Sequence, residues 1–196
     1  GGTAGRGAND PSFLFVEKAD EWLKPGGEAC LLLPSKNFLN ITNETKQARW
    51  LQNHRVERVV QLADFRHILF TSAIAPCMIV RFATVEPGDD HFITYDTPKY
   101  DLSSRRKGFV RITSNDRKLI PQARLHHAAT EGKMAHVLWK QFFWGTPRDW
   151  RLLRYLDGFG KINNLTGGAK AKQRWQKGQG IQPDAKGKAI KPMFPW

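Results

Sequence analysis

The sequence lacks long apolar runs and any obvious export signal. Its longest apolar stretches, such as "EACLLLP" and "SAIAPCMIV", are shorter than ten residues, whereas a helix needs about 20 to cross a bilayer. The first residues, "GGTAGRGAND", contain no basic segment followed by the apolar stretch of a secretory signal. We therefore expect a cytoplasmic protein that does not contact a membrane.

Cysteine is scarce, and metal-ligand spacing is missing. The two cysteines, Cys30 and Cys77, lie in apolar segments, where a thiol packs as a small hydrophobic group. Two buried, reduced thiols are the expectation, with a disulfide between neighbouring strands as the alternative. No Cys-x-x-Cys or Cys/His spacing typical of zinc occurs. We expect no metal and interpret His126 and His127 as a surface or packing feature.

Acidic residues are also few. The 196 residues include 31 Lys and Arg but 18 Asp and Glu, which gives a net charge of +13. Residues 161–196 hold eight Lys or Arg and one Asp, so more than half of the excess lies there. A basic segment that also carries Trp and Gln suits a polyanion, most commonly nucleic acid; a solvated, Lys-rich end is the alternative.

What is present is a pattern of alternating helices and strands. Asp10 followed by Pro11 is a typical helix start, and the helix places an apolar stripe at Phe15, Ala19, Trp22 and Leu23. A second helix, "TNETKQARWLQNH", turns Ala48 and Leu51 inward. Apolar strands are predicted at "EACLLLP", "VERVVQL" and "APCMIVRF", and a more exposed one at "HFITYD". Nearly continuous apolar strands that alternate with helices predict a parallel α/β sheet covered on both faces.

Three regions follow from this pattern. Residues 1–101 form the α/β domain. Residues 102–160 are a connecting region with one short strand at "GFVRIT" and a helical pair, "EGKMAHVLWKQFFWG" and "TPRDWRLLRYLDGFG". The first helix of the pair places apolar residues on one side, at Met134, Val137, Leu138 and Phe142. Residues 161–196 are the basic region.

Four segments carry a family resemblance: "FVEKADEWLKPGGEACLLLPSKNFLN", "ARWLQNHRVERVVQL", "LFTSAIAPCMIVRFATV" and "WKQFFWGTPRDWRLLRYLDGFGKINNL". In this order they resemble the second half of the N6-adenine DNA methyltransferases of bacterial restriction-modification systems. The resemblance covers residues 12 to 180 and rests on several weak motifs. It implies part of a doubly wound, Rossmann-like sheet that binds S-adenosylmethionine, with the third strand inserted antiparallel.

Two motifs of the family lack a convincing counterpart. Its Gly-rich cofactor loop follows a strand, but "GGTAGRG" at residues 1–7 has no strand before it, so we interpret it as a solvated terminus. The catalytic tetrapeptide is Asn or Asp, Pro, Pro, then Tyr or Phe. "DPSF", Asp10 to Phe13, lacks the second proline, and helix capping explains it. We therefore assign no catalytic residue, leave the cofactor-binding residues unknown and expect this chain to bind S-adenosylmethionine poorly.

The remaining site residues are also implied by the resemblance. Phe82 falls where the family places an aromatic residue against the flipped-out target base; packing in the core is the alternative. The basic region resembles the start of a target-recognition domain, whose Lys and Arg would contact phosphates of double-stranded DNA. Its candidate DNA-binding residues are Lys170, Lys172, Arg174, Trp175, Lys177, Lys186, Lys188 and Lys191.

The sequence thus predicts part of a DNA methyltransferase, inactive as this chain alone. The alternative is a non-catalytic DNA-binding or assembly module on the same scaffold. A half-sheet of this kind exposes a strand edge, so we also expect self-association through that edge.

Overall fold

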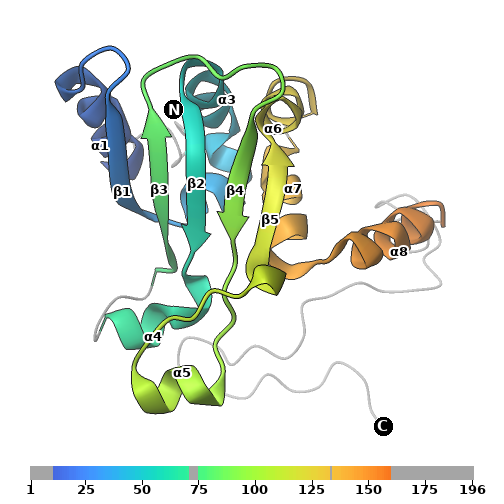
Figure 1. Ribbon diagram of the computed structural model, residues 1–196. Coiled ribbons are helices and arrows are strands. Elements are labelled where there is room, and N and C mark those ends of the chain that lie inside the picture. Colours follow the sequence, from blue (N-terminus) through green and yellow to red (C-terminus); the bar gives the residue numbers. More distant parts are fainter. Residues whose placement is uncertain (1–10, 71–74, 133, 160–196) are drawn as a thin grey trace, which may run out of the picture. The chain divides into compact units, whose positions relative to one another are not determined.

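One five-stranded mixed sheet organises the chain (Figure 1). A computed structural model describes residues 11–70, 75–132 and 134–159. The strands are β1 (Glu28–Pro34), β2 (Arg55–Gln61), β3 (Cys77–Ala83), β4 (Phe92–Asp96) and β5 (Arg117–Pro121). Their order across the sheet is β1-β3-β2-β4-β5.

Helices and short helical turns connect the strands. The α-helices are α1 (Pro11–Trp22), α2 (Lys36–Leu39), α3 (Glu44–Asn53), α4 (Arg66–Leu69), α5 (Leu102–Lys107), α6 (Gln122–His127), α7 (Ala135–Trp144) and α8 (Pro147–Asp157). The short turns are η1 (Ile41–Asn43), η2 (Ala63–Phe65), η3 (Ser114–Asp116) and the π-helical η4 (Ala128–Gly132). The chain divides into two units after Thr146, so α8 belongs to the second unit and is described by itself.

Strand β3 lies between β1 and β2 and pairs antiparallel with both. The inserted antiparallel strand expected from the sequence is therefore confirmed, and β1 and β2 are parallel to each other. The wider prediction of a parallel sheet is wrong. Among the described residues only β2 and β4 are parallel neighbours, while β5 pairs antiparallel with β4. Parallel neighbours need a long crossover, and residues 62–91, which include β3, form the one between β2 and β4.

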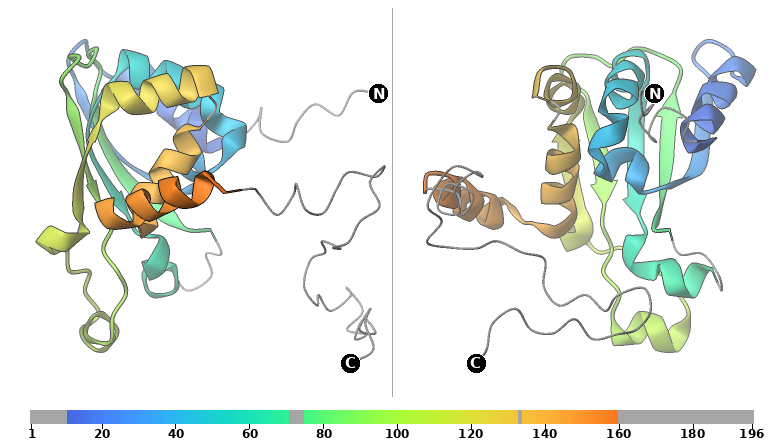
Figure 2. Two further views of the ribbon diagram at one scale, coloured as in Figure 1. Left: turned by 90° about the vertical axis from the view of Figure 1, so that its right-hand side faces the viewer. Right: turned by 180° about the vertical axis from the view of Figure 1, so that it is seen from behind.

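Helices α1, α3, α6 and α7 lie on one face of the sheet, as Figure 2 shows. The strand register assigns side chains to this covered face, where Val56, Val59, Val80, Phe82, Ile93, Tyr95 and Ile120 are fully buried. The opposite face, which we call the open face, carries no α-helix of the described first unit over its strands. The expectation of helices on both faces is therefore wrong.

Strand β1 shows this error most clearly. Cys30 and Leu32 lie on the open face, where Cys30 is exposed and Leu32 is 55% exposed. The prediction that Cys30 is buried is therefore wrong; Cys77 is buried and both thiols are free, as expected. The strand carries apolar residues on both faces, so its composition alone does not say which face is covered.

Two predicted apolar stripes are displaced around their helices. In α1, Ala19 is buried as predicted, but Phe15 and Trp22 are 68% and 76% exposed, and Phe13 and Val16 are buried instead. In α7, Met134 lies before the helix and is exposed, and the buried aromatic residues are Trp139, Phe142 and Phe143. Packing against the sheet determines which face of each helix is buried, and each of these helices has more than one face that is apolar enough to be buried. In α3 the prediction is confirmed, since Ala48 and Leu51 are buried.

The sheet continues beyond residue 101, the predicted end of the α/β domain. Residues 117–121 form β5, although the sequence pattern places them in a connecting region. No strand forms at "GFVRIT", residues 108–113; Val110 instead packs against Leu62, Phe65 and Cys77. Strand β4 exists as predicted, but it is more buried than expected, because β2 and β5 flank it and Ile93 and Tyr95 are fully buried.

Buried polar side chains fix the helices on the covered face. Glu44 of α3 is 1% exposed and accepts hydrogen bonds from the backbone N–H groups of Ala135 and His136, at the start of α7. Gln47 accepts from Trp139 Nε1 at 2.8 Å. Gln122 donates to the carbonyls of Leu51 and His54 and accepts from Val56 N. Because a carboxylate near a helix N-terminus satisfies otherwise unpaired N–H groups, these contacts hold α3 in one position.

Candidate functional site

Phe82, the candidate for stacking on a target base, lies in the core of the covered face. Its exposure is 0%. The ring makes edge contacts with Trp50 at a centroid distance of 5.2 Å and with His54 at 5.4 Å. A stacked base needs a free ring face, and the described structure leaves none. The geometry therefore agrees with the alternative in which Phe82 is a packing residue.

The other sequence-predicted residues mostly lie outside the described part of the chain. This holds for Lys170, Lys172, Arg174, Trp175, Lys177, Lys186, Lys188 and Lys191, for "GGTAGRG" and for Asp10. Of the "DPSF" string, Pro11 begins α1 as expected, Ser12 Oγ bonds Asn37 Oδ1 at 2.7 Å, and Phe13 is 3% exposed. Ser12 and Phe13 thus make packing contacts in the fold, and Asp10, the capping residue expected from the sequence, lies outside the described residues.

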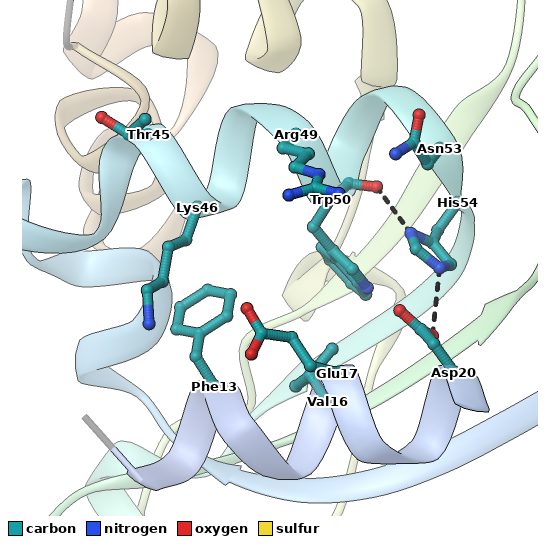
Figure 3. A pocket seen from close by; sticks show the side chains of 10 residues that line it. All are labelled: Phe13, Val16, Glu17, Asp20, Thr45, Lys46, Arg49, Trp50, Asn53 and His54. Atoms are coloured by element: carbon teal, nitrogen blue, oxygen red, sulfur yellow. Dashed lines mark hydrogen bonds and ion pairs between the residues drawn. The ribbon is translucent and has the colours of Figure 1, made fainter. Parts of the chain in front are cut away.

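A pocket of about 480 Å³ separates α1 from α3 (Figure 3). Its size is within the range of small-molecule sites, roughly 300–1,000 Å³. One wall is α1, which contributes Phe13, Val16, Glu17 and Asp20. The other wall is α3 and its C-terminal cap, which contribute Lys46, Arg49, Trp50 and His54. Each set recurs at helical spacing, so each helix turns one side toward the pocket.

The floor of the pocket is apolar and aromatic. Phe13, Val16 and Trp50 are 3%, 2% and 6% exposed, and Phe82 backs Trp50 from the sheet side. The indole Nε1 of Trp50 is buried and has no hydrogen-bond partner in the described structure. An unpaired buried N–H costs roughly 1–3 kcal/mol, so an acceptor that reached it would stabilise the site.

A close contact between a histidine and an aspartate closes one end of the pocket. His54 Nε2 lies 3.0 Å from Asp20 Oδ1, and His54 Nδ1 lies 3.0 Å from the Trp50 carbonyl oxygen. Burial raises the pKa of Asp20; His54 opposes this rise, and the nearby Glu17 adds to it. Asp20 and His54 thus contact each other and link α1 to the C-terminal end of α3.

Two opposite charges at the mouth of the pocket are not joined. Glu17 and Arg49 are both exposed, and no ion pair within 4 Å connects either one to another described residue. Figure 3 shows Glu17 on α1 and Arg49 on α3, with the rings of Phe13 and Trp50 on either side of the Glu17 carboxylate in that view. The pocket therefore offers one anionic wall and one cationic wall over an apolar floor.

A second feature lies where β1, β2 and β4 end, beside α4 and α5 (Figure 1). Phe65 and Tyr100 make an edge contact with a centroid distance of 5.9 Å, which ties the β4–α5 segment to the chain after β2. Exposed or half-exposed basic and aromatic side chains gather on this edge surface, namely Arg66, Lys99, Tyr100, Arg106, Lys107, Phe109 and Arg111. In open α/β sheets the carboxyl ends of strands are the usual ligand edge.

Two partly buried lysines are associated with this edge: Lys99 belongs to the edge surface, and Lys118 lies on β5 next to it. Burial lowers the pKa of Lys99, against the opposing effect of Asp64 and Asp116. Burial also lowers the pKa of Lys118, and repulsion from Lys99 lowers it further. Lys99 Nζ donates to the Phe143 carbonyl at 3.0 Å and lies 4.0 Å from the Phe143 ring centroid, while Lys118 Nζ bonds Thr97 Oγ1 at 2.5 Å. These bonds tie both amines to the core, so we treat them as structural groups.

Within the described ranges, no group of three or more His, Cys, Asp or Glu residues is placed to hold a metal ion. No described helix has the length and apolar character to cross a membrane. His126 and His127 lie at the end of α6, where His127 is exposed and lies 3.7 Å from Glu131.

Sequence reasoning missed the pocket, because its walls come from two helices whose packing is set by the sheet. The available signals were Asp20 at the end of α1 and His54 directly after α3, neither of which stands out in the sequence. A scan against protein-family models gave no match for this chain, and a search of curated proteins gave none either.

Proposed function

We propose that this chain forms part of a DNA methyltransferase, which transfers a methyl group from S-adenosylmethionine to the N6 amine of adenine in duplex DNA. One observation carries the proposal. The antiparallel β3 lies between β1 and β2, which run parallel, and this is the strand arrangement that the family resemblance implies. The long apolar β1 at the sheet edge agrees with a sheet that continues in the intact enzyme.

The cofactor belongs to the intact enzyme in this proposal. The described residues hold no Gly-rich loop that follows a strand and opens a helix, which is the arrangement that brings a backbone close to such a ligand. The chain alone should therefore bind S-adenosylmethionine weakly or not at all in calorimetry at millimolar cofactor. Binding in the low micromolar range would contradict this division of roles and return "GGTAGRG" and "DPSF" to consideration.

The decisive experiment uses the reading frame that encodes the chain. The in-frame upstream sequence is determined, and the complete protein is incubated with labelled S-adenosylmethionine and duplex DNA. We expect a Gly-rich loop, a Pro-Pro-aromatic motif and N6-methyladenine in the product, detected by mass spectrometry. An upstream sequence without both motifs, and a product without label, would support the alternative of a non-catalytic DNA-binding or assembly module.

Both alternatives include DNA as the partner, and the charge distribution supports it. The candidate contacts are the basic region and the edge surface at α4 and α5. Changing Lys170, Lys172, Arg174 and Lys177 together to Ala should weaken duplex binding at every sequence. Each lost phosphate contact should reduce the slope of log affinity against log salt by about 0.9.

Two comparison variants each remove half of that charge from other surfaces. Lys18, Lys24, Arg106 and Lys107 are exposed; Lys18 and Lys24 lie far along the chain from the edge surface, whereas Arg106 and Lys107 belong to it. Ala at the first two should leave the slope unchanged, and Ala at the second two should lower it. An unchanged slope in the variant with four substitutions in the basic region would leave that region without a role in DNA binding.

A further inference from the structure

The α1–α3 pocket is independent of the DNA proposal, because its walls and floor use none of the candidate DNA contacts. Its chemistry has three parts: an unpaired carboxylate on one wall, an unpaired guanidinium on the other, and an apolar floor with an unsatisfied indole N–H, all among the described residues. We propose that this pocket binds a small zwitterion with an apolar side group, the chemistry of an apolar α-amino acid.

The two walls select for both charges at once. A ligand ammonium would lie against Glu17, and a ligand carboxylate would lie against Arg49, whose planar guanidinium suits a bidentate contact. A simple anion meets the repulsion of Glu17 and Asp20, and a simple cation meets that of Arg49 and Lys46. Only a molecule that carries both signs satisfies both walls.

The floor sets the third requirement. Phe13, Val16 and Trp50 present aromatic and aliphatic surface, which suits an apolar side group of the ligand. Trp50 Nε1 adds a donor that a carboxylate or carbonyl oxygen of the ligand can accept. Asp20 and His54 are already paired at 3.0 Å, so they bound the site at one end and leave Glu17 as the ammonium partner.

A ligand series tests the proposal without DNA or S-adenosylmethionine. The chain is titrated by calorimetry with L-phenylalanine, with 3-phenylpropionate, which lacks the ammonium group, and with 2-phenylethylamine, which lacks the carboxylate. We expect L-phenylalanine to bind about tenfold or more tightly than either analogue, because each charge-assisted hydrogen bond contributes on that order. Equal affinity for all three ligands would overturn the proposal. So would the absence of L-phenylalanine binding at 10 mM, which corresponds to a binding free energy weaker than about −3 kcal/mol.

Two variants assign each charge to its wall. Arg49→Gln should weaken L-phenylalanine binding about tenfold but strengthen 2-phenylethylamine binding, because a charge that repels the amine is removed. Glu17→Gln should weaken L-phenylalanine binding but strengthen 3-phenylpropionate binding for the same reason. Glu21→Gln and Arg106→Gln remove exposed charges outside the pocket and serve as controls. Glu17 and Arg49 are exposed, so both variants should fold, as urea unfolding verifies. A loss that is equal for all three ligands, or equal in the controls, would contradict the assignment.

Discussion

The covered face and the open face of the sheet are built from alternate residues of the same strands, yet they differ in composition and in packing. On the covered face, Val59, Val80, Phe82 and Tyr95 are fully buried beneath the helices. On the open face, Leu32, Phe92 and Leu119 are 55%, 49% and 61% exposed. Because successive side chains of a strand point to opposite faces, one register determines both surfaces.

Charge on the open face follows the strand register. Arg81 and Arg58 are paired across β3 and β2, and Arg58 is level with Thr94 of β4. Arg58 and Arg117 both bond Asp96, at 2.6 and 2.9 Å, and Arg81 bonds Glu28 at 2.7 Å. The open face thus holds a network of arginines and carboxylates among exposed apolar groups, with one small buried cluster around Cys77 and Phe65 at its end. The covered face relies on hydrophobic burial along its whole length.

The largest contrast should appear when one apolar residue is truncated on each face. Phe82→Ala should lower the free energy of unfolding by about 3 to 5 kcal/mol, because it leaves a cavity against Trp50 and His54. Leu32→Ala should cost less than about 1 kcal/mol, because more than half of the side chain is already in water. Urea denaturation of both variants measures the difference. Similar losses would show that the open face is covered in solution.

Sequence reasoning predicted the elements better than their environment. The strands β1 to β4 are apolar enough to identify, helix α3 is identified by its amphipathic spacing, and the family resemblance implied the inserted β3. The uncovered side of β1 could not be foreseen, because "EACLLLP" is apolar on both of its faces. Which face is covered depends on where α1 packs, and that position is a tertiary contact.

The misassigned residues 102–125 show a different limit. Strand β5, "RKLIP", begins with two charged residues and ends with proline, a composition typical of a loop. It forms because β4 offers a free edge, and because Ile120 becomes buried on the covered face opposite Ile93. The α1–α3 pocket has the same origin, since the packing of α1 and α3 on the sheet brings Glu17 and Arg49 to the same pocket.

The arginine network of the open face offers the next contrast. Asp96 is 0% exposed and is held by Arg58 and Arg117, whose side chains are 42% and 50% exposed. Asp96→Ala should lower the free energy of unfolding by about 1 to 3 kcal/mol, since two charge-assisted bonds are lost but both arginines remain hydrated. Thermal unfolding at two salt concentrations measures it. Glu28→Ala, which removes the exposed partner of Arg81, is the control and should cost less.

The two edges of the sheet extend the comparison. In β1 the backbone groups of Ala29, Leu31 and Leu33 face β3, as the bonds from Ser35 N to the Pro76 carbonyl and from Thr84 N to the Gly27 carbonyl indicate. The backbone groups of Glu28, Cys30 and Leu32 point away from β3, toward the edge of the sheet, where no described strand pairs with them. A long apolar edge of this kind promotes pairing with another chain, so we expect the chain to self-associate through β1.

Leu32→Lys should weaken that association about tenfold, because a lysine on an edge strand opposes pairing. Light scattering across a concentration series measures the change. Leu119→Lys is the matched control on β5, the opposite edge, which already carries Arg117, Lys118 and Pro121 and should associate little. A monomer at high concentration would contradict the expectation and indicate that the β1 edge is tolerated as it is.

The smallest effect concerns Lys118, which the register places on the covered face beside Tyr95. Burial, followed by repulsion from Lys99, lowers its pKa below the ordinary value of 10.5. The folded protein therefore holds this proton less tightly than the unfolded chain does. The free energy of unfolding should then rise as the pH increases from the folded pKa to 10.5, since the unfolded chain binds more protons in that interval.

Lys118→Met removes this titration and should flatten the rise. At pH 7 the free energy of unfolding should change by no more than about 0.5 kcal/mol, because the side chain is only half-buried. Two effects of the substitution also oppose each other: the bond to Thr97 is lost, and the cost of burying the charge is removed. Urea unfolding between pH 7 and pH 10.5 provides the measurement, and Lys107→Met, which removes an exposed lysine, provides the control. The contrary outcome is that both variants show the same dependence of the free energy of unfolding on pH as the original chain. In that case the Lys118 ammonium would be as well hydrated as a charge on the open face, and the contrast between the two faces would not extend to β5.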